Sequence, residues 1–267
     1  MITAIIIINN RRYTVECSES NTVLDVLESI RKEKKLSLHY RHSCHHGSCG
    51  TCGAIINCIE GLMCLTKISD LMHERKTASG KDTVAPQYEN GKLIINLEPL
   101  KKATYIADIA VYPAQLFESI PETASYKRSI ERANASQLEP DSSYDELYKQ
   151  ICSDSAQTQE PVPDKHVFMK NSLIRNKLEL CIECGLCLSA CPEEFRGPAG
   201  LAAIHTALAK NKPETSTYSN LLALAYAEDG IAQCKRHFAC SRVCPQGVAP
   251  GRRIQELRAI DSKNSNT

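Results

Sequence analysis

Thiols are the side chains of this chain best suited to do chemistry. The chain has 14 cysteines among 267 residues, well above ordinary usage but below the share found in short secreted disulfide scaffolds. Cys17 and Cys152 stand alone, and the remaining cysteines fall into three groups: Cys44, Cys49, Cys52, Cys58 and Cys64; Cys181, Cys184, Cys187 and Cys191; and Cys234, Cys240 and Cys244. In a reducing compartment, such an excess indicates metal binding.

The first group has three closely spaced cysteines and a later fourth, in the order Cys44-x4-Cys49-x2-Cys52-x11-Cys64. This is the plant-type ferredoxin arrangement, in which four thiolates hold a two-iron (2Fe-2S) cluster. Glycines within the loop would let the backbone approach the sulfurs and turn N–H groups toward them; they are Gly47, Gly50 and Gly53. We therefore predict a 2Fe-2S cluster on Cys44, Cys49, Cys52 and Cys64.

This first loop also allows other interpretations. A structural zinc site would use paired Cys-x2-Cys motifs, which do not account for the x4 and x2 spacings with their glycines. Cys58 could replace Cys64 as the fourth ligand, although a buried free cysteine near a strand end is the simpler interpretation. A Rieske-type site would use histidines, but four cysteines already complete the ligand set; the histidines nearby are His42, His45 and His46.

The second and third groups form an internal repeat. The run Cys181-x2-Cys184-x2-Cys187-x3-Cys191-Pro192 matches the bacterial ferredoxin motif, whose fourth cysteine ligates the other of two clusters. The third group repeats it as Cys234-x5-Cys240-x3-Cys244-Pro245, with His237 in place of the second cysteine. Exchange of the fourth cysteines assigns a four-iron (4Fe-4S) cluster to Cys181, Cys184, Cys187 and Cys244. Three thiolates remain and favour a three-iron (3Fe-4S) cluster on Cys191, Cys234 and Cys240.

His237 leaves two possibilities for this last cluster. Imidazole can bind iron, so His237 could complete a histidine-ligated 4Fe-4S cluster. It could instead line the cluster pocket, where it would donate a hydrogen bond to a sulfide or face solvent beside Lys235 and Arg236. Two zinc sites with mixed cysteine and histidine ligands are a further alternative, although they would not predict the repeated x2, x2, x3 spacing.

The segments that must position the first group predict a small α+β unit. The β-branched run Ile2–Ile8, a turn at Asn9-Asn10 and a return at Tyr13–Val15 predict a hairpin. The apolar spacing of Val23–Ile30 predicts a helix that Asn21 caps. Further strands are expected at Ala54–Ile56 and Leu93–Leu97, an order typical of a β-grasp ferredoxin.

The segments around the other two groups predict helices. Residues 199–209 and 221–227 are rich in Ala and Leu at helical spacing, and Gly197-Pro198 suits a helix start. The tract Ser125–Gln159 is polar, as linkers are. We predict an α+β chain with its domain boundary near 105–120: a β-grasp plant-type 2Fe-2S ferredoxin domain at 1–105, connecting helices and linker at 106–165, and an all-α bacterial-ferredoxin-like domain with two clusters at 166–267.

Composition and missing motifs exclude several function classes. The 32 basic and 31 acidic side chains nearly cancel, so the net charge of the chain does not favour binding to nucleic acid. No apolar stretch approaches the roughly 20 residues of a membrane span, and no signal-peptide pattern opens the sequence. Dinucleotide, phosphate-loop and nucleophile-elbow motifs are also missing. We expect a cytoplasmic protein without catalytic residues of its own.

In ligand order and spacing, the chain resembles the iron-sulfur subunits of succinate dehydrogenase and fumarate reductase. The resemblance covers most of the chain and includes the motifs Leu97-Glu-Pro-Leu100, Ile106-Ala-Asp108-Ile109, Gly197-Pro-Ala-Gly-Leu201 and Cys244-Pro-Gln-Gly-Val-Ala-Pro-Gly251. It implies a non-catalytic electron-transfer subunit between a FAD-containing flavoprotein subunit and a quinone or another carrier. It also implies either a membrane-anchor subunit, with the chain peripheral on the inner face of the cytoplasmic membrane, or a soluble carrier.

The chain departs from that family near the expected quinone pocket. Quinone-using members usually carry Trp shortly after the Cys-Pro of the second group and His after the first cysteine of the third. In this chain Phe195-Arg196 takes the place of the Trp segment, and Lys235 takes the place of the His. The chain has no Trp at all, and the stretch from Pro192 to Gly197 is short. A thiol, a soluble carrier or a diverged anchor are therefore alternative electron partners. Another flavoprotein dehydrogenase, a heterodisulfide-linked reductase and a zinc-stabilised interaction protein are the alternatives for the protein as a whole.

Overall fold

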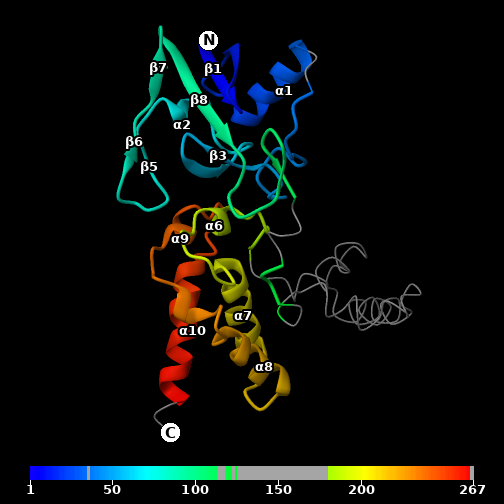
Figure 1. Ribbon diagram of the computed structural model, residues 1–267, viewed down its shortest axis with the longest axis vertical. Coiled ribbons are helices and arrows are strands. Elements are labelled where there is room, and N and C mark those ends of the chain that lie inside the picture. Colours follow the sequence, from blue (N-terminus) through cyan, green and yellow to red (C-terminus); the bar gives the residue numbers. More distant parts are fainter. Residues whose placement is uncertain (35–36, 113–117, 122–123, 125–179, 265–267) are drawn as a thin grey trace, which may run out of the picture.

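The computed structural model describes residues 1–34, 37–112, 118–121, 124 and 180–264. A β-sheet with its helix lies at one end of the molecule, and a group of helices lies at the other (Figure 1). The predicted linker Ser125–Gln159 and the lone Cys152 lie outside the described residues. The predicted class, α+β with a sheet domain before a helical domain, is confirmed.

The sheet has strand order β2-β1-β8-β3-β4, and β7 also pairs with β8, at its Lys92 end. Strands β1 and β8 run parallel, whereas the other pairs are antiparallel. The predicted strands are confirmed within slightly longer elements: β1 (Ile2–Ile8), β2 (Arg11–Cys17), β3 (Gly53–Ile56) and β8 (Lys92–Glu98), joined by β4 (Ile59–Leu62) and β7 (Gln87–Glu89).

Alternating burial explains why these segments form a sheet. In β8, every second side chain is buried while its neighbours are partly exposed, which is the period of a strand with one face on a core. The β1–β2 turn has positive φ at Asn9 (48°) and Asn10 (63°), as a type I′ turn requires. Helix α1 (Val23–Lys34) covers the core face with its predicted apolar residues: Val23, Leu24, Val26, Leu27 and Ile30.

The predicted cap of α1 is wrong by one residue. Thr22 Oγ1 accepts the N–H of Asp25 at 3.1 Å, and Asp25 Oδ2 accepts the N–H of Thr22 at 2.8 Å. This reciprocal pair is a capping box. Asn21 instead accepts the N–H of Ser18 at 2.8 Å, so its side chain closes the preceding turn.

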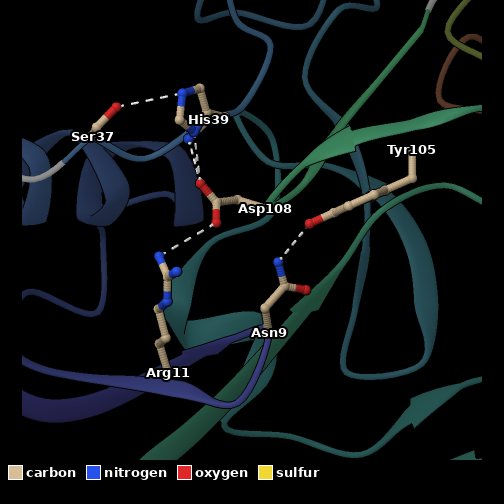
Figure 2. A network of polar contacts seen from close by, with 6 residues as sticks. All are labelled: Asn9, Arg11, Ser37, His39, Tyr105 and Asp108. Atoms are coloured by element: carbon tan, nitrogen blue, oxygen red, sulfur yellow. Dashed lines mark hydrogen bonds and ion pairs between the residues drawn. The ribbon is translucent and has the colours of Figure 1, made fainter.

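A short hairpin after the sheet returns to it. Strands β9 (Tyr105–Ala107) and β10 (Ala110–Val111) flank Asp108, which is 7% exposed. The carboxylate accepts the backbone N–H of His39 at 2.8 Å, lies 3.0 Å from His39 Nδ1 and lies 3.9 Å from Arg11 Nη1 (Figure 2). Asn9 Nδ2 donates to the Tyr105 hydroxyl at 2.9 Å. These contacts attach the hairpin to the sheet domain.

The remaining elements of the sheet domain are short. They are α2 (Ile68–Leu71) and the two-stranded pair β5 (Arg75–Lys76) and β6 (Thr83–Val84).

Between residues 180 and 264 the chain forms helices and no strand. The predicted helices are confirmed, and Gly197, at φ 92°, precedes Pro198 in the first helical position. The elements are α6 (Leu186–Ser189), α7 (Pro198–Lys210), α8 (Ser216–Ala225), the 3-10 helix η3 (Ile231–Gln233), α9 (Ala239–Arg242) and α10 (Pro250–Asn264). Helices α7, α8 and α10 share one apolar core. Among the described residues, no helix combines the length and apolar character needed to cross a bilayer.

Candidate metal centres

The first cysteine group lies in a loop whose backbone turns toward sulfur. Cys44 Sγ accepts the N–H groups of His46 at 3.4 Å, Ser48 at 3.3 Å and Cys49 at 3.4 Å. Gly47 has a φ of 80° and Gly50 a φ of 71°, a conformation that favours glycine. Hydrogen bonding, chiefly from Ser48, lowers the pKa of Cys44 to about 5. The loop therefore stabilises a thiolate, which is the form that binds iron.

The β3–β4 hairpin brings together Cys52 and Cys64, two of the four predicted ligands of this group. Cys52 precedes β3 and Cys64 follows β4, and the N–H of Met63 donates to the Cys52 carbonyl at 3.0 Å. Burial, followed by a hydrogen bond with Cys52, raises the pKa of Cys64 to about 12. Cys58 occupies the turn at the opposite end of this hairpin and is exposed. The expectation that it is buried is therefore wrong, because the tight turn leaves its side chain outside the core.

The three histidines of this loop contact one another and nearby polar groups. His42 Nδ1 lies 3.1 Å from His45 Nε2, and His42 Nε2 lies 3.5 Å from Glu28 Oε1. His46 Nε2 lies 3.0 Å from the Ser48 hydroxyl. These contacts give the histidines partners at the surface of the loop, which does not favour the Rieske-type alternative.

The helical domain contains two cavities that divide the remaining cysteines. The first cavity is otherwise lined mostly by apolar side chains of the Cys181–Leu188 loop, α7 and the segment before α10. Burial raises the pKa of Cys184 to about 11 and that of Cys187 well above its ordinary value. The thiols that line this cavity are Cys181, Cys184, Cys187 and Cys244.

The second cavity lies between α9, the start of α10 and the segment after Cys191. Its thiols are Cys191, Cys234 and Cys240. Burial raises the pKa of Cys240 to about 11 and also raises that of Cys191. Each run thus contributes its last cysteine to the other run's cavity, since α6 ends before Cys191 and α9 ends before Cys244.

His237 also lines the second cavity, but its ring is engaged by a carboxylate. His237 Nε2 lies 2.6 Å from Glu193 Oε1. Arg242 Nη1 donates to the His237 carbonyl at 3.0 Å. The side chain predicted as a possible ligand is therefore in hydrogen-bond contact with a carboxylate on the cavity wall.

The loop Cys44–Cys52, here called the two-iron loop, is in direct contact with the first helical cavity. A Cβ on Gly50 would lie 2.5 Å from the Ile182 carbonyl oxygen and 3.0 Å from Cys184 Cβ. Gln246, which also lines the cavity, donates from Nε2 to the Gly47 carbonyl at 3.0 Å. Only a glycine permits this approach, so the spacing between the two groups of thiols depends on Gly50.

A buried polar link fixes the same interface. Ser189 in α6 donates to Glu60 Oε1 in β4 at 3.1 Å and accepts the N–H of Lys101 at 3.0 Å. Ser189 is 3% exposed and Glu60 is 7% exposed. Sequence reasoning missed both residues, and the only available signal was a charged residue within the short apolar strand β4.

The residues present fit iron-sulfur clusters. The donors are thiols, the soft ligands that such clusters use, and backbone N–H groups converge on Cys44. Elsewhere the thiols surround cavities, and nowhere in the described ranges do three His, Cys, Asp or Glu side chains converge on a single ion.

Comparison with known proteins gives matches along nearly the whole chain. Residues 9–118 match the family model of the 2Fe-2S iron-sulfur cluster binding domain, and residues 177–248 match that of the 4Fe-4S dicluster domain. The fumarate reductase iron-sulfur subunit of Wolinella succinogenes is 28% identical over 93% of this chain and 87% of its own length. The fumarate reductase iron-sulfur subunit of Haemophilus influenzae is 26% identical over 94% of this chain and 86% of its own length.

More distant matches agree with these. The mitochondrial succinate dehydrogenase [ubiquinone] iron-sulfur subunit 3 of Arabidopsis thaliana is 25% identical over 89% of this chain and 64% of its own length. A chain of the Mycobacterium smegmatis Sdh1 complex in the apo form has a TM-score of 0.63 at 19% identity, covering 100% of this chain and 98% of that one. This last similarity supports the fold.

Proposed function

Because this chain belongs to the family of succinate dehydrogenase and fumarate reductase iron-sulfur subunits, we propose that it passes electrons between a FAD-containing flavoprotein subunit and a quinone or another carrier. The observation that carries this proposal is the contact between the two-iron loop and the first helical cavity at Gly50. That contact joins the first set of thiols to the second, and the exchange of Cys191 and Cys244 between the two runs joins the second set to the third. The clusters, when bound, would accept and release single electrons.

The chain's own residues would hold and insulate these clusters. Cys44, Cys49, Cys52 and Cys64 would hold the 2Fe-2S cluster, and Cys181, Cys184, Cys187 and Cys244 the 4Fe-4S cluster. The N–H groups around Cys44 would stabilise thiolate charge, while the apolar wall of the first cavity would exclude water. Gly50 and Ser189 would keep the two sites at a fixed separation.

For the second cavity we favour a 3Fe-4S cluster on Cys191, Cys234 and Cys240. The support is the 2.6 Å contact between His237 Nε2 and Glu193 Oε1, because a ring nitrogen engaged by a carboxylate is less available to iron. The alternative, a histidine-ligated 4Fe-4S cluster, would need His237 to leave Glu193.

The test of this function is anaerobic purification of the tagged chain from its native cells. We expect a brown protein with about nine irons per chain, the sum of clusters with two, four and three irons. We also expect a co-purifying flavoprotein whose reduction by succinate, or oxidation by fumarate, changes the paramagnetic resonance signals of this chain. Stoichiometric zinc without iron would refute the proposal, and a flavoprotein that reacts with neither acid would favour another dehydrogenase or a heterodisulfide-linked reductase.

A further inference from the structure

A buried amide on α10 faces the second cavity without a partner. Gln255 and Gly251, one helical turn apart, both line this cavity. Gln255 Nε2 is buried and donates to no acceptor among the described residues. A buried donor without an acceptor destabilises the fold, so such a group calls for a partner in the space that it borders.

The other polar groups of the cavity wall narrow the choice of that partner. The Glu193 carboxylate is paired with His237 at 2.6 Å. The backbone carbonyl of Cys234 accepts from Arg258 Nη2 at 2.7 Å. The same cavity is lined by the three thiols, which would hold the cluster there. Thiolate and sulfide sulfurs accept hydrogen bonds but cannot donate them. The amide N–H of Gln255, and not its carbonyl oxygen, can therefore bond to such a sulfur.

Helix α10 is well placed to hold this amide against the cluster. Arg258, three residues after Gln255, also donates to the Ile231 carbonyl at 2.7 Å. The same helix therefore anchors the loop that carries Cys234 and presents Gln255 to the cavity. The corresponding amide of the first cavity, Gln246, is already used, since its Nε2 donates to Gly47.

We propose that the side-chain N–H of Gln255 donates a hydrogen bond to a sulfur of the cluster held by Cys191, Cys234 and Cys240 and raises its reduction potential. The reduced cluster carries one more negative charge than the oxidised cluster, so a hydrogen bond to its sulfur stabilises the reduced form more. The hydrogen bond thereby makes the cluster of the second cavity a better electron acceptor than it would be without Gln255. This inference rests on the cluster assignment proposed above.

The test uses the whole chain, purified anaerobically with its clusters, in a redox titration followed by paramagnetic resonance. Gln255→Leu replaces the amide by an apolar side chain of similar size. In this variant we expect the equilibrium constant for reduction of the cluster in the second cavity, here called the third cluster, to fall about tenfold, or about 59 mV for one electron. The midpoints of the other two clusters should not move. Gln87→Leu makes the same change on the exposed strand β7 and should leave all three midpoints unchanged.

A second variant keeps the test decisive if Gln255→Leu does not assemble. Gln255→Met retains the length of the side chain and removes the donor, and it should give the same shift. A third-cluster midpoint equal to that of the wild type in either assembled variant, with the signal intact, would overturn the role of Gln255. Wild-type protein without a third-cluster signal would instead refute the cluster assignment, so the two failures are distinguishable.

Discussion

Replacing Ser189 by Ala should loosen the interface between the two domains. The substitution removes the hydroxyl that donates to Glu60 and accepts from the N–H of Lys101. The Ser189 and Glu60 side chains are both buried, so water cannot readily replace the bond between them. An unsatisfied buried group costs about 1–3 kcal/mol, and more if it is charged. Because the substitution leaves the buried Glu60 carboxylate without this donor, we expect a loss of about 3 kcal/mol in the free energy of local opening.

Hydrogen exchange of the cluster-loaded protein, read by mass spectrometry, measures this loss directly. At 1.4 kcal/mol for each factor of ten, the amide of Lys101 should exchange roughly a hundredfold faster than in the wild type, provided that exchange follows local opening. Ser219→Ala, at an exposed position of α8, serves as the control. Its free energy of local opening at Lys101 should stay within the roughly 0.5 kcal/mol of the wild type that is typical of surface substitutions. A Lys101 exchange rate in Ser189→Ala within about twofold of the wild type would show that this link does not hold the domains together.

Three further outcomes are expected. Cys244→Ala should abolish the four-iron signal and spare the two-iron signal, whereas loss of the three-iron signal alone would contradict the exchange of ligands between the two runs. His237→Ala should retain the three-iron signal of the air-oxidised protein; a signal that is absent in the wild type and present in this variant would make His237 a ligand. Iodoacetamide at neutral pH should label exposed Cys58 before Cys17, because burial raises the pKa of Cys17 and keeps its unreactive thiol form until the pH rises toward that pKa. Peptide mass spectrometry distinguishes the two, and equal labelling would refute this order.

The strands and the grouping of thiols could be anticipated because local rules govern them. Alternation in Leu93–Leu97 and the Asn9-Asn10 turn depend on a few neighbouring residues, and both predictions are confirmed. The runs around Cys181 and Cys234 match the bacterial ferredoxin motif, in which the fourth cysteine of each run ligates the other cluster. Because this motif already specifies the exchange, the division of the thiols between two cavities could be predicted without the tertiary structure.

The features that sequence reasoning missed depend on residues far apart or on a choice between neighbours. Glu60 and Ser189 are 129 positions apart, and nothing near either residue indicates the other. The cap of α1 falls on Thr22 because Asp25 can pair with it reciprocally, while Asn21 serves the preceding turn. Both residues are good caps, so only the backbone path decides between them.

The exposure of the three sites indicates where electrons would enter and leave. None of the residues that line the first cavity is exposed, and the two-iron loop contacts it at Cys184 and Gln246. By contrast, His45 and His46 beside the two-iron ligands are exposed, as are Lys235 to Phe238 on the wall of the second cavity. Electron transfer weakens steeply with distance, so partners would exchange electrons at these two exposed sites. The middle site, which has no exposed lining residue, would then serve as the relay between them, which is why its separation from the two-iron loop, fixed at Gly50, matters more than its access to solvent.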